Sequence, residues 1–563
     1  MVFNNAIGQV AQIGIKVGGS PLAVDKISLL FEAEVETTLD LPSMFTLRFY
    51  DNEDLVLTDG SVFTVGEAVE IELGDTISGQ MQPVMKGEIT AIEPEFTEDR
   101  QILFTVRGYD RAHRLNRGAK TRTFVNAKDS DIVQKIGAEA GLSVTAEATT
   151  QVFEHIFQDD QTDFAFLHER AHRIGYELFV DDRKLYFRKP KGSRGELTLV
   201  WGESLRSFRP RLTLAKQVNE VTVKGWDPAT KKAIVGTAAS SSTQPAIGDG
   251  KWGGQAAQSA FSAAKHLVVR RPVATQNDAK AVAQAILDEI NASFVEAEGL
   301  AFGVPGLVAG KKVKMEKVGT RFGGQYVVTS ARHVYSAVTG YDTYFAVEGI
   351  RPQQMADLLG ERTETSLWGG VVTALVTNNN DPKKMARVKL KFPWLDDTAE
   401  SSWARVAGVG AGATRGLHWL PEVNDEVLVA FEMGDFNRPY VIGGLWNGVD
   451  KQPQEGAVKA GKVEIRTIQT RVGHKIRLVD DPAGPLIEIV DSKGNTTIKM
   501  EEQTRKITIT SKGDIDLKAT GNLNLEGLNV SVKAKTKLDL QGTTADVKAS
   551  GILNVKGAMV NIN

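Results

Sequence analysis

The chain contains no cysteine among its 563 residues, and this absence excludes disulfide bonds and metal centres held by thiolates. Its formal net charge is only −3 at pH 7, so the whole chain has no electrostatic attraction to nucleic acid or to an anionic membrane. No apolar run approaches the roughly 18–20 residues that a membrane span needs. The amino terminus, MVFNNAIGQVAQIGIKVGG, lacks the basic and apolar segments of a signal peptide. We therefore expect synthesis in the cytosol, and any export needs another route.

The composition, with 42% apolar and 24% charged residues, is typical of a globular protein, and the length predicts several domains. Short runs of alternating polarity between turn residues predict a mainly-β chain. The predicted domains are a β-barrel at residues 1–110, an α+β insertion at 111–204, a second β-barrel at 205–360 with a helix at 277–298, a small barrel at 366–450, a linker at 451–465 and a repeat region at 466–563. The glycine-rich stretch 236–260 predicts a long mobile loop.

The last sixty or so residues form a repeat in which apolar and polar residues alternate and the pattern restarts about every eight residues. Each unit predicts a short strand that buries its apolar edge only by stacking on neighbours. The apolar residues are too few and slender to close a core within one chain, so we expect several chains to share it in an intertwined, trimeric β-helix. The predicted core consists of Ile507, Ile509, Ile515, Leu517, Leu523, Leu525, Val530, Val532, Leu538, Leu540, Val547, Leu553 and Val555.

Residues 168–172 read HERAH and match the H-E-x-x-H pattern, in which two histidines on one helical face bind zinc and the glutamate acts as general base. Asp163 is expected to cap this helix. The longer metzincin pattern needs a third ligand at the position of Leu178, which cannot bind a metal. We therefore interpret His168, Glu169 and His172 as part of a structural helix, with a zinc metalloprotease as the alternative.

The region 366–450 predicts a five-stranded barrel of the OB type, because its short strands are joined by turns rich in Gly, Asn, Asp and Pro. The expected strands are 370–376, 386–392, 402–408, 426–431 and 440–446. OB barrels often bind nucleic acid through exposed aromatic and basic side chains. Here acidic residues offset the basic ones and each aromatic residue falls where a strand packs inward, so no nucleic-acid partner is expected.

The run GGVVTALVTNNNDPKKMARVKLKFPW, followed by SSWARV and LPEVNDEVLVAFEMGDFNRPYVIGGLWNG, resembles the central OB domain of VgrG-type spike proteins. Upstream, DFAFLHERAHRIGYELFVDDRKLYF is similar to the family's hub segment, and GGQYVVTSARHVYSAVTGYDTYFAV resembles the end of its second hub barrel. The first 100 residues match only in β character. These spike proteins belong to type VI secretion systems, contractile phage tails and extracellular contractile injection systems.

The resemblance implies a homotrimer in which two hub barrels per chain adapt a threefold spike to a sixfold inner tube. It also implies an OB neck and a triple-stranded β-helix needle. The implied partners are an inner tube protein, baseplate components, cargo effectors and a small PAAR-like tip protein, and the needle would puncture a target cell envelope. The tip protein is expected to dock on the last residues, Met559, Val560, Asn561, Ile562 and Asn563. No cofactor or metal is expected.

The predicted function is therefore mechanical, and we expect no enzyme activity. From the end of the sequence at VKGAMVNIN and the short linker at 451–465, we expect neither an effector domain after the repeats nor an enzyme inserted before them. The alternatives are the metalloprotease, a β-helical polysaccharide-degrading tailspike and a passive adhesive fibre. A tailspike needs paired carboxylates on a long repeat face, whereas the acids here are scattered. We expect assembly in the cytoplasm into a phage-tail-like or extracellular particle, although a type VI system remains open.

Overall fold

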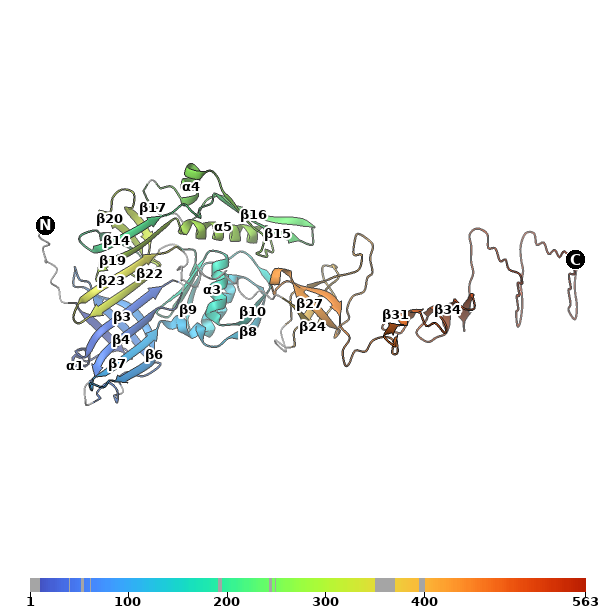
Figure 1. The fold of residues 1–563 in the computed structure, drawn as a ribbon, viewed down its shortest axis with the longest axis horizontal. Helices are drawn as coiled ribbons and strands as arrows, with labels where there is room; N and C mark the ends of the chain where they lie inside the picture. The colour runs from blue at the N-terminus through green and yellow to red at the C-terminus, as the bar shows by residue number, and fades with distance from the viewer. Residues whose placement is uncertain are drawn as a thin grey trace. The chain divides into compact units, whose positions relative to one another are not determined.

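The computed structural model describes residues 11–39, 41–51, 55–60, 62–190, 195–242, 246–248, 250–349, 370–393 and 400–562. The chain divides into two compact units, residues 1–450 and 451–563. Strands outnumber helices in both units, which confirms the mainly-β fold class. Figure 1 shows the larger unit as layered sheets with a few helices packed on them.

An 11-stranded sheet dominates the larger unit and contains strands from both predicted hub barrels. Its early strands are β1 (Ile13–Val17), β2 (Ser20–Pro21), β3 (Leu30–Thr38), β4 (Met44–Asp51), β5 (Ala68–Gly74), β6 (Met81–Phe96) and β7 (Ile102–Tyr109), with the short helix α1 (Val24–Ile27) between β2 and β3. Its later strands are β14 (Leu205–Leu212), β19 (Val295–Phe302), β22 (Ser330–Ser336) and β23 (Gly340–Val347). The two groups meet where β3 pairs antiparallel with β22, as the blue and yellow strands of Figure 1 show.

The alternation of side chains along these strands explains where the cores lie. Along β3, Ala33, Val35 and Thr37 are buried, whereas the glutamates between them lie on the other face. Two hydrophobic clusters pack against the sheet, one under its early strands around Phe49 and Phe104, and one under its later strands. The early and late strands therefore share one continuous sheet, but each group has a core of its own.

The insertion begins directly after β7. Its elements are η1 (Arg111–Asn116), β8 (Lys120–Ala127), α2 (Asp129–Glu139), β9 (Ser143–Ala146), β10 (Phe153–Gln161), α3 (Asp163–Arg173), β11 (Glu177–Asp181) and β12 (Lys184–Arg188). The predicted helix after residue 162 forms, but the prediction of Asp163 as its cap is wrong, because the Thr162 hydroxyl accepts a hydrogen bond from the Ala165 N–H at 3.2 Å. Asp163 instead forms ion pairs of 2.6 Å with Lys120 and Arg122.

Two smaller sheets and two helices complete the later part of the hub. One sheet contains β13 (Glu196–Val200), β17 (Ala246–Ile247), β20 (Lys312–Glu316) and β21 (Gly324–Val327), and the other contains β15 (Glu220–Asp227), β16 (Lys232–Ala238) and β18 (Lys265–Val268). Helix α5 (Gln276–Ala292) packs on the second sheet, with Val282 and Leu287 in the shared core.

Two predictions in this region are wrong. The helix expected at 277–298 ends at Ala292, because the residues from Val295 onward form β19, which pairs with strands on both sides. Those sheet hydrogen bonds outweigh the local helix propensity of Glu and Ala. The loop expected at 236–260 contains the end of β16 and the start of α4 (Gly253–Phe261), anchored by the buried Trp252.

The small barrel of the larger unit is closed, as predicted. Its strands are β24 (Val371–Asn378), β25 (Arg387–Lys391), β26 (Ala404–Val406), β27 (Glu426–Phe431) and β28 (Pro439–Gly444), with the short η2 (Glu432–Gly434) after β27. They close in the order β24-β25-β26-β28-β27. The alternating residues Val427, Val429 and Val441 are fully buried inside. All five expected strands are present, with bounds that differ by a few residues.

The smaller unit begins with a hairpin and continues as a sheet. The hairpin consists of β29 (Val458–Lys459) and β30 (Lys462–Val463), and it lies within the predicted linker. An antiparallel sheet follows, with β31 (Ile465–Gln469), β32 (Lys475–Val479), β33 (Leu486–Val490), β34 (Thr496–Glu501) and β35 (Lys506–Ser511) in sequence order. From 512 to 562 the described chain forms no helix or strand. The triple-stranded β-helix therefore stays a prediction, since one chain offers no partner strands to pair with.

Candidate functional site

The sheet β31–β35 of the smaller unit has an uncovered apolar face. Its register aligns two cross-strand rows, one of Ile468, Ile476, Ile489, Ile498 and Ile509, the other of Leu478, Ile487, Met500 and Ile507. Side chains that lie directly opposite each other share a face, so both rows form one apolar surface. Even Ile489 on the central strand β33 is 46% exposed, and Ile507 at the edge is 67% exposed. We refer to these two rows as the apolar rows.

The opposite face of this sheet is mixed: it carries Ile465, Val479, Leu486 and Val490 at its margins and a polar row between them. Its central row contains Thr467, Arg477, Glu488, Lys499 and Thr508, all half-buried. Arg477 Nε donates to the Glu488 carboxylate at 2.9 Å across the two strands. This arrangement reverses the usual one, in which apolar residues are covered and polar residues face water. The apolar rows are therefore the surface of this sheet that another chain would cover.

The terminal repeat continues the same alternation after β35. The predicted core residues from Ile515 to Val555 are between 53% exposed, for Ile515, and 79% exposed, for Leu540. At the end of the chain Met559 is 78% exposed, Val560 49% and Ile562 90%, and Asn561 is exposed as well. Asn563, which was also predicted to contact a tip protein, lies outside the described residues. A stretch with so many exposed apolar side chains marks an interaction surface.

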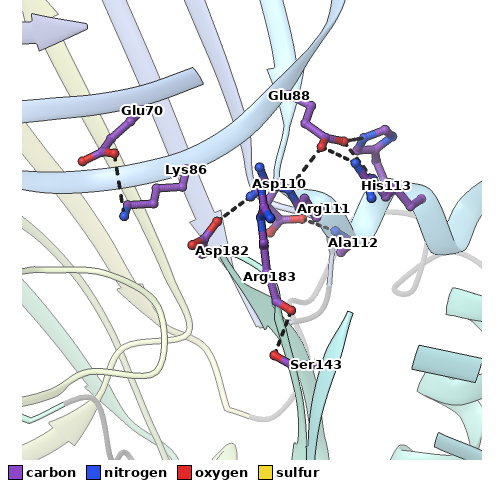
Figure 2. A network of polar contacts seen from close by, with 11 residues as sticks. Glu70, Lys86, Glu88, Asp110, Arg111, Ala112, His113, Ser143, Asp182 and Arg183 are labelled. Atoms are coloured by element: carbon purple, nitrogen blue, oxygen red, sulfur yellow. Dashed lines mark hydrogen bonds and ion pairs between the residues drawn. The ribbon is translucent and has the colours of Figure 1, made fainter. Parts of the chain in front are cut away.

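In the hub, a buried carboxylate joins the large sheet to the insertion. Glu88 on β6 is 7% exposed, and its carboxylate accepts a hydrogen bond from Arg111 Nε at 3.1 Å (Figure 2). It also accepts one from Arg114 Nε at 3.0 Å. His113 Nε2 lies 3.0 Å from the same carboxylate. Burial disfavours its charged form, but the hydrogen bonds from Arg114 and His113 outweigh burial and hold the pKa of Glu88 below its ordinary value. Arg111 also pairs with Asp182, in the turn between β11 and β12.

A second joint connects the insertion to the small barrel. Phe157 on β10 is part of the barrel's hydrophobic core, where its ring stacks on that of Phe436 at a centroid distance of 4.5 Å. The Phe157 N–H donates to Asn437 Oδ1 at 2.9 Å. His155 Nε2 lies 2.7 Å from the Glu400 carbonyl oxygen, and burial lowers the pKa of His155, which favours its neutral form. The larger unit is therefore continuous through packed side chains from the large sheet to the barrel.

The H-E-x-x-H residues are on α3, and each contacts a different neighbour. His168 stacks on Phe164 with ring centroids 5.9 Å apart. Glu169 accepts a hydrogen bond of 3.2 Å from a glutamine of β10. His172 Nε2 lies 3.4 Å from Glu289 Oε2 on α5. Across the residues that the structure describes, no three His, Cys, Asp or Glu side chains come together as metal ligands do. The contacts of Glu169 and His172 join α3 to β10 and α5, whereas that of His168 lies within the helix.

Neither joint was predicted from the sequence. Glu88 carried a weak signal, since it is a carboxylate directly before the apolar Ile89 in a strand whose neighbours are buried. Phe157 carried no such signal, because its partner Phe436 is far away in the sequence.

In the described part of the chain no helix is both long and apolar enough to span a membrane.

Two protein-family models match the chain. The Alg8 N-terminal domain matches residues 9–337, which is more than half of the chain, and the type VI secretion system/phage-baseplate injector OB domain matches residues 372–446. The first range covers the insertion and every strand of the large sheet except β23. The second coincides with the closed barrel, from β24 to the residues just after β28.

Curated relatives match over shorter stretches. The type VI secretion system spike protein VgrG1b of Pseudomonas aeruginosa is 29% identical over 124 residues, which cover 20% of this chain and 17% of that protein. The spike protein VgrG3 of Vibrio cholerae is 33% identical over 85 residues, which cover 14% of this chain and 8% of that protein. The chain thus matches less than a fifth of either relative's length. A chain of the Francisella PdpA–VgrG complex shares the fold, with a TM-score of 0.52 and 8% identity over 91% of this chain and 90% of that one.

Proposed function

This chain belongs to the VgrG-type spike proteins, with the Alg8 N-terminal domain at residues 9–337, and from that membership we propose that it is the central spike of a contractile injection particle. In this proposal three copies assemble around one axis. The hub strands form a ring that meets a sixfold inner tube, the small barrels form a neck, and the terminal repeats form a needle.

The observation that carries the proposal is the uncovered apolar surface of the smaller unit. The apolar rows of β31–β35 and the exposed repeat residues after them extend over nearly a hundred residues, and within the described part of the chain all of them except the half-buried Ile498 are exposed. A strand edge without a partner and an apolar face without cover are both unstable in water. Further copies of the same chain supply identical strands, so all copies can be covered at once. The number three comes from the family and not from the exposed surface.

The mechanism of such a spike is mechanical. In an interwound needle each strand shares backbone hydrogen bonds with neighbouring copies, so one strand cannot separate without breaking several others. The load on the needle must also reach the hub. Within the larger unit the ring contact of Phe157 joins the barrel to the insertion, and the ion pairs of Glu88 join the insertion to the large sheet. An axial force is therefore transmitted through buried contacts rather than through loops.

The proposed partners follow from this arrangement. The tip surface consists of Met559, Val560, Asn561, Ile562 and Asn563, and a small PAAR-like protein would bind there. The hub would bind the inner tube protein, baseplate components and cargo effectors, and the needle would pass through a target cell envelope. Assembly would take place in the cytoplasm, in a phage-tail-like or extracellular particle. The relatives above are spike proteins of type VI systems, and that class of particle also fits.

Light scattering of the purified full-length chain under native conditions tests the proposal. We expect a mass three times that of the chain at micromolar concentration. Electron microscopy of the same sample should show a thin rod attached to a broader head. A monomer at every accessible concentration would contradict the proposal, because one chain then leaves the apolar rows in water.

A further inference from the structure

The loop between β26 and β27 is a preformed arm that its own barrel does not cover. Residues 407–419, called the arm below, are all exposed. The Leu417 N–H donates to the Val409 carbonyl at 2.9 Å, and the Gly412 N–H donates to the Arg415 carbonyl at 3.0 Å. The two sides of the arm therefore pair with each other as a small hairpin. Internal hydrogen bonds give the arm a defined shape without support from a core.

Both ends of the arm are attached to the barrel. At its start the Ala407 N–H donates to the Val441 carbonyl of β28 at 2.8 Å. Just after its end Leu420 packs against the barrel core, and the Pro421 carbonyl accepts a hydrogen bond of 3.2 Å from Asn379 Nδ2. Because both of its ends are bonded to the barrel, the barrel fixes the direction in which the arm projects.

The side chains of the arm are those of a contact surface. Val409 is 77% exposed, Leu417 54% and Trp419 53%. The prediction that each aromatic residue of the barrel packs inward is therefore wrong for Trp419, which lies on a loop rather than on a strand. Arg415 carries the formal charge near the tip, and its guanidinium forms no ion pair or hydrogen bond with the residues that the structure describes. Aromatic and arginine side chains are enriched where proteins bind one another.

The same barrel presents a second apolar patch, the outer face, on the strands β24, β27 and β28. Register places Val371 opposite Ala430, and Leu428 opposite Gly443, on the side away from the core. Val371 is 55% exposed, and the neighbouring Ile442 is 46% exposed. A Cβ added at Gly443 would meet nothing within 4 Å, so this patch is flat and has room for a large side chain.

We propose that the arm of one copy packs on the outer face of the next copy's barrel, so that three arms link three barrels into a ring. The inference rests on the proposed function, because it requires three copies around one axis. A cyclic trimer needs two different surfaces on each chain, since every interface joins unlike patches. The arm and the outer face are two such surfaces on one small barrel. Charge also fits, because Arg415 is basic and Glu426 borders the outer face next to Gly444.

Cysteine cross-linking tests this contact cleanly, because the chain has no cysteine of its own. The double variant Val371→Cys with Leu417→Cys is oxidised with copper phenanthroline and run on a non-reducing denaturing gel. A ring in which the arm meets the next copy's outer face gives covalent trimers. A face-to-face pair gives dimers at most, and an arm that folds onto its own barrel gives monomers, and either result overturns the proposal.

Two further variants control the experiment. The pair Val371→Cys with Asn380→Cys puts the second thiol in an exposed turn of the same barrel, and it should give no covalent trimer. Adding Trp419→Glu to the cross-linking pair should lower the yield of covalent trimer at least fivefold. Light scattering on each unoxidised variant distinguishes a failure of the arm contact from a failure of the spike proposal. A native trimer without cross-links overturns the arm contact alone, whereas a native monomer of the unsubstituted chain overturns the spike proposal together with it.

Discussion

Phe157 of the insertion and Phe436 of the small barrel stack with their ring centroids 4.5 Å apart, inside one hydrophobic core. The barrel core is therefore incomplete without a residue that precedes the barrel by more than two hundred positions. Phe392 and Phe431 of the barrel complete the same aromatic group around Phe436. Because its core includes a residue of the insertion, the barrel cannot move independently of the insertion.

Replacing Phe157 by alanine should lower the free energy of unfolding by about 3–5 kcal/mol, because the substitution removes a buried ring and leaves a cavity. Differential scanning calorimetry of the full chain measures the effect, and limited proteolysis should then release the barrel from the hub. Phe261→Ala is the matched control, since Phe261 is 71% exposed and its loss should change stability by less than about 0.5 kcal/mol. Equal effects of the two substitutions would contradict a shared core.

Replacing Glu88 by glutamine should cost up to about 3–5 kcal/mol, because it keeps the shape but leaves the 5% exposed Arg111 with only the partly exposed Asp182 as a carboxylate partner. The sign of the pH dependence follows from the lowered pKa of Glu88. The ion pairs contribute fully above the ordinary pKa of a glutamate, and the contribution is lost as the pH falls through the lower folded value. Denaturant unfolding at several pH values should therefore show a difference between variant and wild type that shrinks in strong acid.

The control for Glu88 is Glu93, a carboxylate on the same strand whose ion pair is exposed. Glu93 lies 3.1 Å from Arg107, and both side chains are at least 40% exposed. Glu93→Gln should change stability by less than about 1 kcal/mol, since solvent screens exposed ion pairs. A Glu88→Gln effect as small as that of Glu93→Gln would show that the joint contributes little.

The alternation of polarity was sufficient to predict the small barrel, because each of its strands has one solvent-facing side and one buried side. The single sheet across both hub barrels could not be predicted, since the pairing of β3 with β22 depends on contacts between distant segments. The helix predicted to run to residue 298 failed for a related reason. Glu296 and Glu298 favour a helix locally, but β14 and β23 provide hydrogen-bond partners on both sides.

For the predicted needle, the local sequence pattern does not conflict with the structure, but one chain lacks the pairing partners that the pattern requires. Its pattern in the sequence is clear, and Ile507 and Ile509 do lie on a strand. The later repeats have no strand partner within one chain, so their local pattern alone does not produce a sheet. Strands form only where another backbone supplies hydrogen bonds, and for these repeats that backbone would belong to another copy.

Zinc analysis tests the interpretation of the H-E-x-x-H helix. We expect the purified protein to contain far less than one zinc per chain, because His172 lies beside Glu289 and His168 stacks on Phe164. The double variant His168→Ala with His172→Ala should show the same trace level by elemental analysis. Stoichiometric zinc that disappears in the double variant would restore the metalloprotease alternative.

His333 predicts a pH dependence of hub stability. The side chain is fully buried, its Nδ1 lies 2.7 Å from the Tyr341 hydroxyl, and burial lowers the pKa of His333 to about 4. The unfolded chain takes up this proton near pH 6.5, so between about pH 6.5 and 4 it binds more protons than the folded chain. Stability should therefore fall as the pH falls through this window, by up to about 3 kcal/mol. His333→Gln should flatten this part of the denaturation profile, and an unchanged profile would mean that His333 does not titrate as described.

Two adjacent residues of β35 distinguish a shared needle from a solvated tail. Ile509 belongs to the apolar rows and Thr510 lies on the opposite face, and both are exposed in the single chain. Ile509→Asp should therefore leave one chain intact but bury an unpaired carboxylate when copies associate, at a cost of several kcal/mol per site. We expect tryptic cleavage within residues 465–563 to become about tenfold faster or more, since each 1.4 kcal/mol is a factor of ten in an equilibrium. Thr510→Asp should leave the cleavage rate close to that of the wild type. If the two variants are cleaved alike, the apolar rows face water in the assembled protein and the needle is not built on them.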